Sequence, residues 1–155
     1  MRAVKYKTRM VDQRAVLEKE FSMNYPNLDR SLNSPEKVVR LAREVLRLHE
    51  ETEEYCYMIC TNNKLQLTGI FELSHGNVNS SIVGIREMYQ KALLANAVNV
   101  FVLHNHPSGD PKPSVEDIRI TNRMKDAGDL LGVGFLDHIV IGDTSYVSLK
   151  EAGHV

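Results

Sequence analysis

Residues 98–124 read VNVFVLHNHPSGDPKPSVEDIRITNRM, and this stretch decides what kind of fold the chain adopts. It opens with a run at 98–103 that is apolar except for Asn99, and its length and valine content predict a buried β-strand. A loop with three prolines follows, and an apolar-periodic segment then runs from Val115 to about Leu131, before Gly132 and Gly134. The stretch therefore predicts a strand, a rigid loop and a helix in succession.

The segments on either side carry similar signals. Ser34 and Pro35 suit the cap and the first position of a helix, and apolar residues follow them at helical spacing. We also expect a helix at 85–96 and strands at 55–60, 65–73, 135–141 and 146–149, the first two joined as a hairpin through Asn62 and Asn63. Alternating helices and strands favour an α/β fold, a central mixed β-sheet flanked by helices.

The composition fits a single domain. The chain has 155 residues, of which 43% are hydrophobic, enough for one substantial core but not for a second full domain. We expect residues 1–30 to form an N-terminal extension of unclear role, with a short helix around 12–21. Residues 31–155 would then form the domain that carries the functional site.

Membrane and disulfide signals are absent from the sequence. No apolar run approaches the 18 or so residues of a membrane span, and no secretory signal follows Met1, so we expect a cytoplasmic protein. The two cysteines, Cys56 and Cys60, lie on one face of a predicted strand. They are expected to be buried thiols that do not pair with each other.

The charge balance argues against a general affinity for nucleic acid. The net charge is −1 and the sequence pI is about 6.6, so binding to DNA would have to be local. Its best location is a group of basic residues near the amino end: Arg2, Lys5, Lys7, Arg9, Arg14 and Lys19. A charge run of this kind is more often a solvated segment.

Two histidines and an aspartate surround the proline-rich loop at spacings that suit a metal site. His104 and His106 lie two positions apart at the end of the predicted strand, so both imidazoles can reach one ion. Asp117 falls in the first turn of the next helix and becomes a third ligand if that turn folds back over the strand end. Three protein ligands with an open fourth position are typical of catalytic zinc. The competing interpretation is that Ser114 and Asp117 simply form a helix capping box.

The pattern His104-x-His106-Pro107, six residues and then Ser114-x-x-Asp117 resembles the JAMM motif of the JAB/MPN/Mov34 metalloenzymes. Asparagine between the histidines, with PSGDP after them, is similar to the RadC-like branch of that family. Other RadC-like segments are residues 79–83, 86–88, 91–93, 136–143 and 146–149. The resemblance covers about residues 34–151. It does not cover the amino end, where full-length RadC proteins carry a helix-hairpin-helix region that we do not find.

The resemblance implies a deaminase-like JAB/MPN fold with one Zn²⁺ per chain. His104, His106 and Asp117 would bind the zinc, and Ser114 would help to position or stabilise an oxyanion. His138 is expected to be a satisfied core histidine outside the ligand set.

The family also uses an upstream glutamate as general base. Glu53 matches it by its spacing from the following turn, whereas Glu54 matches it by standing directly before an aromatic residue. Strand alternation sends the two side chains to opposite faces, so only one can face the metal, and Glu53 is preferred.

The function implied by the resemblance is that of a JAMM-type zinc metallopeptidase. It would hydrolyse a peptide or isopeptide bond in a peptide or protein substrate, with a zinc-activated water and the glutamate base. Two alternatives stay open: a DNA-repair or nucleic-acid processing accessory protein of the RadC type, and a non-catalytic binding module on the same fold. The intact set of His104, His106, Ser114 and Asp117 argues against the binding module. The sequence does not indicate the oligomeric state.

Overall fold

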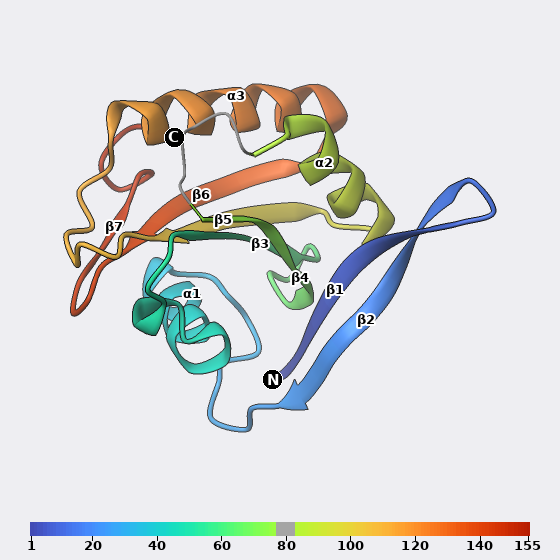
Figure 1. The fold of residues 1–155 in the computed structure, drawn as a ribbon, viewed down its shortest axis with the longest axis horizontal. Helices are drawn as coiled ribbons and strands as arrows, with labels where there is room; N and C mark the ends of the chain where they lie inside the picture. Colours follow the sequence, from blue (N-terminus) through green and yellow to red (C-terminus); the bar gives the residue numbers. More distant parts are fainter. Residues whose placement is uncertain (77–82) are drawn as a thin grey trace.

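The computed structural model describes residues 1–76 and 83–155, and these residues form a seven-stranded sheet with helices on both faces (Figure 1). The strands are β1 (Arg2–Val11), β2 (Arg14–Asn24), β3 (Tyr55–Thr61), β4 (Leu67–His75), β5 (Asn99–Asn105), β6 (Gly134–Ile141) and β7 (Tyr146–Ser148). The helices are α1 (Pro35–Leu41), α2 (Ile85–Leu94) and α3 (Val115–Leu131), with a π-helical turn at Ala42–Leu46 and a 3-10 turn at Leu48–Glu50. Among residues 1–76 and 83–155, every helix is too short or too polar to span a bilayer.

The sheet is mixed, as predicted. Its strands lie in the order β2-β1-β4-β3-β5-β6-β7. Strand β5 is antiparallel to β3 on one side and parallel to β6 on the other. The prediction of an α/β fold with a central mixed sheet flanked by helices is therefore confirmed.

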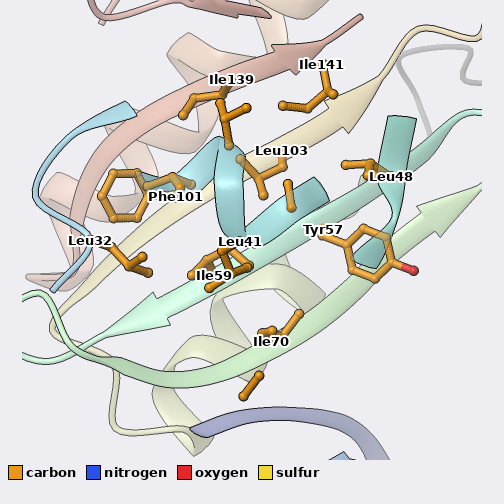
Figure 2. Close-up of a cluster of buried hydrophobic side chains, with 14 residues drawn as sticks. Leu32, Leu41, Leu48, Tyr57, Ile59, Ile70, Phe101, Leu103, Ile139 and Ile141 are labelled. Atoms are coloured by element: carbon orange, nitrogen blue, oxygen red, sulfur yellow. The ribbon is translucent and has the colours of Figure 1, made fainter. Parts of the chain in front are cut away.

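Side-chain alternation gives the central strands two apolar faces. Helix α1 packs on one face, where Leu41 lies in a buried cluster with Ile59 and Leu103 (Figure 2). Helices α2 and α3 cover the opposite face, where Met58 and Val102 belong to a second buried cluster. Strands covered on both faces read as continuous apolar runs, which explains the sequence of β3 and β5.

The strand, loop and helix predicted around the histidines are present. Helix α3 has the predicted bounds and ends at Gly132, whose φ of 71° is the left-handed conformation common after helices. Strand β5 continues through His104 to Asn105, two residues beyond the predicted end. His104 therefore belongs to the sheet itself and takes its direction from the strand pleat.

Strands β3 and β4 form the predicted antiparallel hairpin, although β4 begins later than expected. Leu65 has a φ of 55° and lies in the turn, so the strand starts only at Leu67. Helix α2 ends at Leu94, two residues before the predicted end. Of the RadC-like segment at 79–83, residues 79–82 lie outside the described residues.

The prediction of a short helix around residues 12–21 is wrong. Strands β1 and β2 pair antiparallel from Arg2↔Asn24 to Val11↔Arg14, and Asp12 and Gln13 form the turn between them. Both turn residues have positive φ, 47° and 62°, as a two-residue type I′ hairpin turn requires. Strand β1 also pairs in parallel with β4, so the hairpin extends the sheet (Figure 1).

The two cysteines lie where the sequence predicts. Both are free and buried, and both belong to the cluster beneath α2 and α3. Burial raises the pKa of Cys56 and of Cys60 to about 12. They are therefore neutral core thiols at physiological pH.

Candidate metal centre

Four side chains converge where β5 ends near the first turn of α3. Glu54, His104, His106 and Asp117 each offer one ligand atom, and these atoms all lie within 4.8 Å of one another. The Nε2 atoms of the two histidines are 3.0 Å apart, and Asp117 Oδ1 lies 3.3 Å from Nε2 of His104. This group could hold a metal ion, and it includes the three ligands predicted from the sequence.

The sheet determines where the two histidines point. His104 shares the pleat direction of Val100 and Val102, so its side chain lies on the face covered by α2 and α3 and is only 3% exposed. His106 follows the end of β5, but its backbone N–H donates to the carbonyl of Ile141 at 2.9 Å. This hydrogen bond continues the pairing with β6 and keeps His106 in line with His104.

Asp117 is oriented by a helix cap. The backbone N–H and the hydroxyl of Ser114 both donate to Asp117 Oδ2 at 2.6 Å, and the Asp117 N–H donates to the Ser114 hydroxyl at 3.1 Å. The other oxygen, Oδ1, is the one that lies near His104. The capping box and the ligand cluster therefore coexist, because the cap holds one carboxylate oxygen and leaves the other for the site.

The structure places Glu54, and not the preferred Glu53, beside the two histidines. Glu54 Oε1 lies 3.8 Å from Nε2 of His104, whereas Glu53 is outside the group of four. Cys56 lies opposite His104 in the β3–β5 pairing, so the two side chains share a face. Glu54 precedes Cys56 by two residues and takes the same face, while Glu53 takes the other. The preference for Glu53 rests on its spacing from the turn that follows β3, and that spacing carries no information about how β3 pairs with β5.

His138 is buried and hydrogen-bonded, as expected of a core histidine, but it also contacts the site. Its Nε2 lies 2.8 Å from Nδ1 of His104, and its Nδ1 lies 2.6 Å from the hydroxyl of Thr121. Sequence reasoning missed Thr121 and this contact. The available signal was the position of His138 on a strand parallel to β5, which does not by itself give the register.

The electrostatics of the site differ from residue to residue. Burial raises the pKa of Glu54, and burial lowers the pKa of His104 well below its ordinary value. A hydrogen bond that His106 donates to the Asp117 carboxylate raises the pKa of His106. Burial alone would raise the pKa of Asp117, but His106, His104 and the Ser114 cap together lower it. The site thus holds one firmly ionised carboxylate beside a second that binds a proton more readily.

Two cavities meet at Glu54. One, of about 220 Å³, is lined by Glu54, Val83, His106, Ser114, Glu116, Asp117 and Ile120. The other, of about 470 Å³, is lined by Thr52, Glu53, Glu54, Gly76 and Pro107. Glu53 therefore faces a cavity next to the site although it does not join the ligand group. Of the predicted metal ligands, His106 and Asp117 line the first cavity, and none lines the second.

Curated proteins similar to this chain come from both bacteria and archaea. UPF0758 proteins of Desulfitobacterium hafniense and Clostridium acetobutylicum are 43% and 44% identical to it over 122 residues, which is 79% of this chain and 53% and 52% of theirs. A UPF0758 protein of Methanosarcina barkeri is 43% identical over 126 residues, 81% of this chain and 54% of its own length. The chain thus spans about half the length of the curated relatives it matches.

A family profile covers most of the chain and includes the candidate metal centre. The profile described as the RadC-like JAB domain matches residues 32–154, which contain all four site residues. The match begins after the β1–β2 hairpin, and the division of the chain into residues 1–30 and 31–155 stays a prediction. The chain belongs to the RadC-like JAB domain family.

Proposed function

We propose that the chain is a zinc-dependent hydrolase that cleaves a peptide or isopeptide bond. The observation that carries this proposal is the convergence of two imidazole nitrogens and two carboxylates within 4.8 Å of one another, at the wall of a cavity that Glu54, His106 and Asp117 line. A binding module has no need of a carboxylate with a raised pKa beside a set of metal ligands. A hydrolase needs both a metal site and a proton acceptor.

Zinc is the ion that suits the donor set best. His104, His106 and Asp117 supply two nitrogens and one oxygen, a combination that catalytic zinc uses with a fourth position left open. Bonds of about 2.1 Å to a tetrahedral ion place its ligand atoms roughly 3.4 Å apart. The two Nε2 atoms lie 3.0 Å apart and Asp117 Oδ1 lies 3.3 Å from Nε2 of His104, both close to that value.

The roles of the remaining residues follow from their positions. When bound, zinc would lower the pKa of a water molecule and polarise the substrate carbonyl. Glu54 would accept the proton of the attacking water and pass it to the leaving amine, and burial already raises its pKa for that task. Ser114 lines the same cavity. Its hydroxyl donates to Asp117, so contact with an oxyanion requires rotation of that hydroxyl towards the substrate.

The substrate that we propose is a peptide or protein chain. The cavities on the two sides of Glu54 give space for residues before and after the scissile bond. That the bond is a peptide or isopeptide bond, and that a peptide or protein partner carries it, are both parts of this proposal.

The test compares Glu54→Gln with Glu53→Gln, two adjacent glutamates that differ in the face they occupy. Both variants and the wild-type chain would be loaded with zinc and incubated with peptide and isopeptide libraries, with products read by mass spectrometry. Glu54→Gln should lower the rate by about 100- to 10,000-fold because a general base is lost. Glu53→Gln should stay near the wild-type rate, and both variants should keep their zinc.

Two results would contradict the proposal. Loss of hydrolysis in Glu53→Gln with normal rates in Glu54→Gln would remove Glu54 from the reaction. Zinc-loaded wild-type chain that cleaves no member of either library would favour the non-catalytic binding module.

A further inference from the structure

We propose that His138 and Thr121 are positioning residues that select the tautomer of His104, so that its Nε2 presents a lone pair to the candidate metal centre. This inference rests on the metal site of the proposed function and does not depend on the bond that is cut. It assigns a role to two buried polar residues that contact the site without belonging to the ligand group.

Three short contacts form one chain of hydrogen bonds. The Thr121 hydroxyl lies 2.6 Å from the backbone carbonyl of Asp117 and 2.6 Å from Nδ1 of His138. His138 Nε2 then lies 2.8 Å from Nδ1 of His104. Thr121, His138 and His104 are 0%, 2% and 3% exposed, so water does not compete for these bonds.

The donor and acceptor roles in this series of hydrogen bonds are set at its end on α3, where Thr121 lies. A carbonyl oxygen has no hydrogen, so the Thr121 hydroxyl must donate to Asp117 and can only accept from Nδ1–H of His138. His138 then has a bare Nε2, which must accept from Nδ1–H of His104. The neutral imidazole of His104 carries a single hydrogen, and Nε2 is left free to bind a metal ion.

Reversing the donors and acceptors in this series would break the hydrogen bond between Thr121 and the Asp117 carbonyl. If His104 carried its hydrogen on Nε2, its Nδ1 would accept from His138, and Nδ1 of His138 would accept from the Thr121 hydroxyl. Thr121 would then have no hydrogen for the Asp117 carbonyl, and two buried oxygens would face each other at 2.6 Å. One buried hydrogen bond would be lost and the lone pairs of the two oxygens would repel each other, so the contact with Asp117 favours the tautomer of His104 with its hydrogen on Nδ1.

The two site histidines are held in different ways. His106 donates from Nδ1 to the backbone carbonyl of Asp110 at 2.8 Å, so a backbone group holds a hydrogen on its Nδ1. His104 has no carbonyl at its Nδ1 and depends on two side chains from β6 and α3. The series of hydrogen bonds also ends on the backbone carbonyl of Asp117. It therefore links β5 and α3, the elements that carry the proposed ligands His104 and Asp117.

The experiment replaces Thr121 by valine, which keeps the shape and removes the hydroxyl, and by serine, which keeps the hydroxyl. Thr61→Val is the matched control, because Thr61 is also fully buried and its hydroxyl also donates to a backbone carbonyl, that of Asn99. Zinc affinity would be measured on the full chain by competition with a chelator. The histidine tautomers of the metal-free chain would be read from ¹⁵N NMR shifts.

Loss of a hydrogen-bond partner behind a metal ligand weakens metal binding by about 10- to 100-fold, and we expect that loss in Thr121→Val. Thr121→Ser should restore wild-type affinity, and Thr61→Val should keep it. The NMR spectrum should show hydrogen on Nδ1 of His104 in the wild-type chain and a mixture of tautomers in Thr121→Val.

Wild-type zinc affinity in Thr121→Val would overturn the proposal, and so would an equal loss in Thr61→Val. Hydrogen on Nε2 of His104 in the wild-type chain would also overturn it. None of these readouts uses hydrolysis, so a chain that binds zinc and cleaves nothing would refute the proposed function while leaving this inference intact.

Discussion

The candidate metal centre and the β1–β2 hairpin are held by very different amounts of packing. His104 is 3% exposed, and the strand that carries it is paired on both sides. Of residues 2–24, all of them described, only Ala3 is buried, while Met10 and Met23 are 65% and 53% exposed. The family match covers the first region and not the second. The difference suggests that the site needs the central sheet and the two helices above it far more than it needs the hairpin.

The largest difference between these regions should appear in stability. Leu103→Ala removes a fully buried side chain from β5 and should lower the free energy of unfolding by about 2–5 kcal/mol. Met10→Ala in the hairpin should change it by less than about 0.5 kcal/mol. Urea unfolding followed by circular dichroism measures both. A cost above 2 kcal/mol at Met10 would show that the hairpin is part of the cooperative core.

A smaller effect is expected at the helix cap beside the site. Ser114→Ala removes the hydroxyl that caps α3 and should cost about 0.5–2 kcal/mol of unfolding free energy. Ser108, in the same loop, is the control, because its hydroxyl accepts only a long bond of 3.4 Å from the Asp110 amide. Ser108→Ala should stay within about 0.5 kcal/mol of the wild-type chain. Equal unfolding curves for the two variants would argue against the cap.

The region around the site is the part of the fold that local sequence signals describe best. Ser114, Gly132 and the apolar spacing between them are enough to predict both ends of α3, because caps and periodicity act within the helix itself. The two-residue spacing of His104 and His106 likewise predicts their shared direction, since it depends on one strand alone.

The features that the sequence did not reveal depend on contacts between distant segments. The position of Glu54 beside His104 follows from the pairing of Cys56 with His104, which no local sequence pattern indicates. The contact of His138 with His104 depends in the same way on the register of β5 and β6. Residues 12–21 form no helix because β2 pairs with β1, which in turn pairs with β4.

The smallest expected effect concerns nucleic acid and the hairpin. Five of the six basic residues predicted as a local DNA site are exposed there: Arg2, Lys7, Arg9, Arg14 and Lys19. Two of them, Lys7 and Arg9, lie within 4 Å of Glu18, which offsets part of their charge. We therefore expect no measurable binding of duplex DNA at about 0.15 M salt, tested by fluorescence anisotropy. Binding that falls steeply with salt and is lost in Arg9→Ala would instead support the nucleic-acid alternative.

The most direct test of the central claim is the zinc content of the purified chain after zinc loading, beside His104→Ala and Asp117→Ala. Circular dichroism would confirm that both variants are folded. The account predicts close to one zinc per wild-type chain and almost none in either variant, because each lacks one of three protein ligands. A wild-type chain that takes up no zinc, or a variant that keeps a full equivalent, would contradict it.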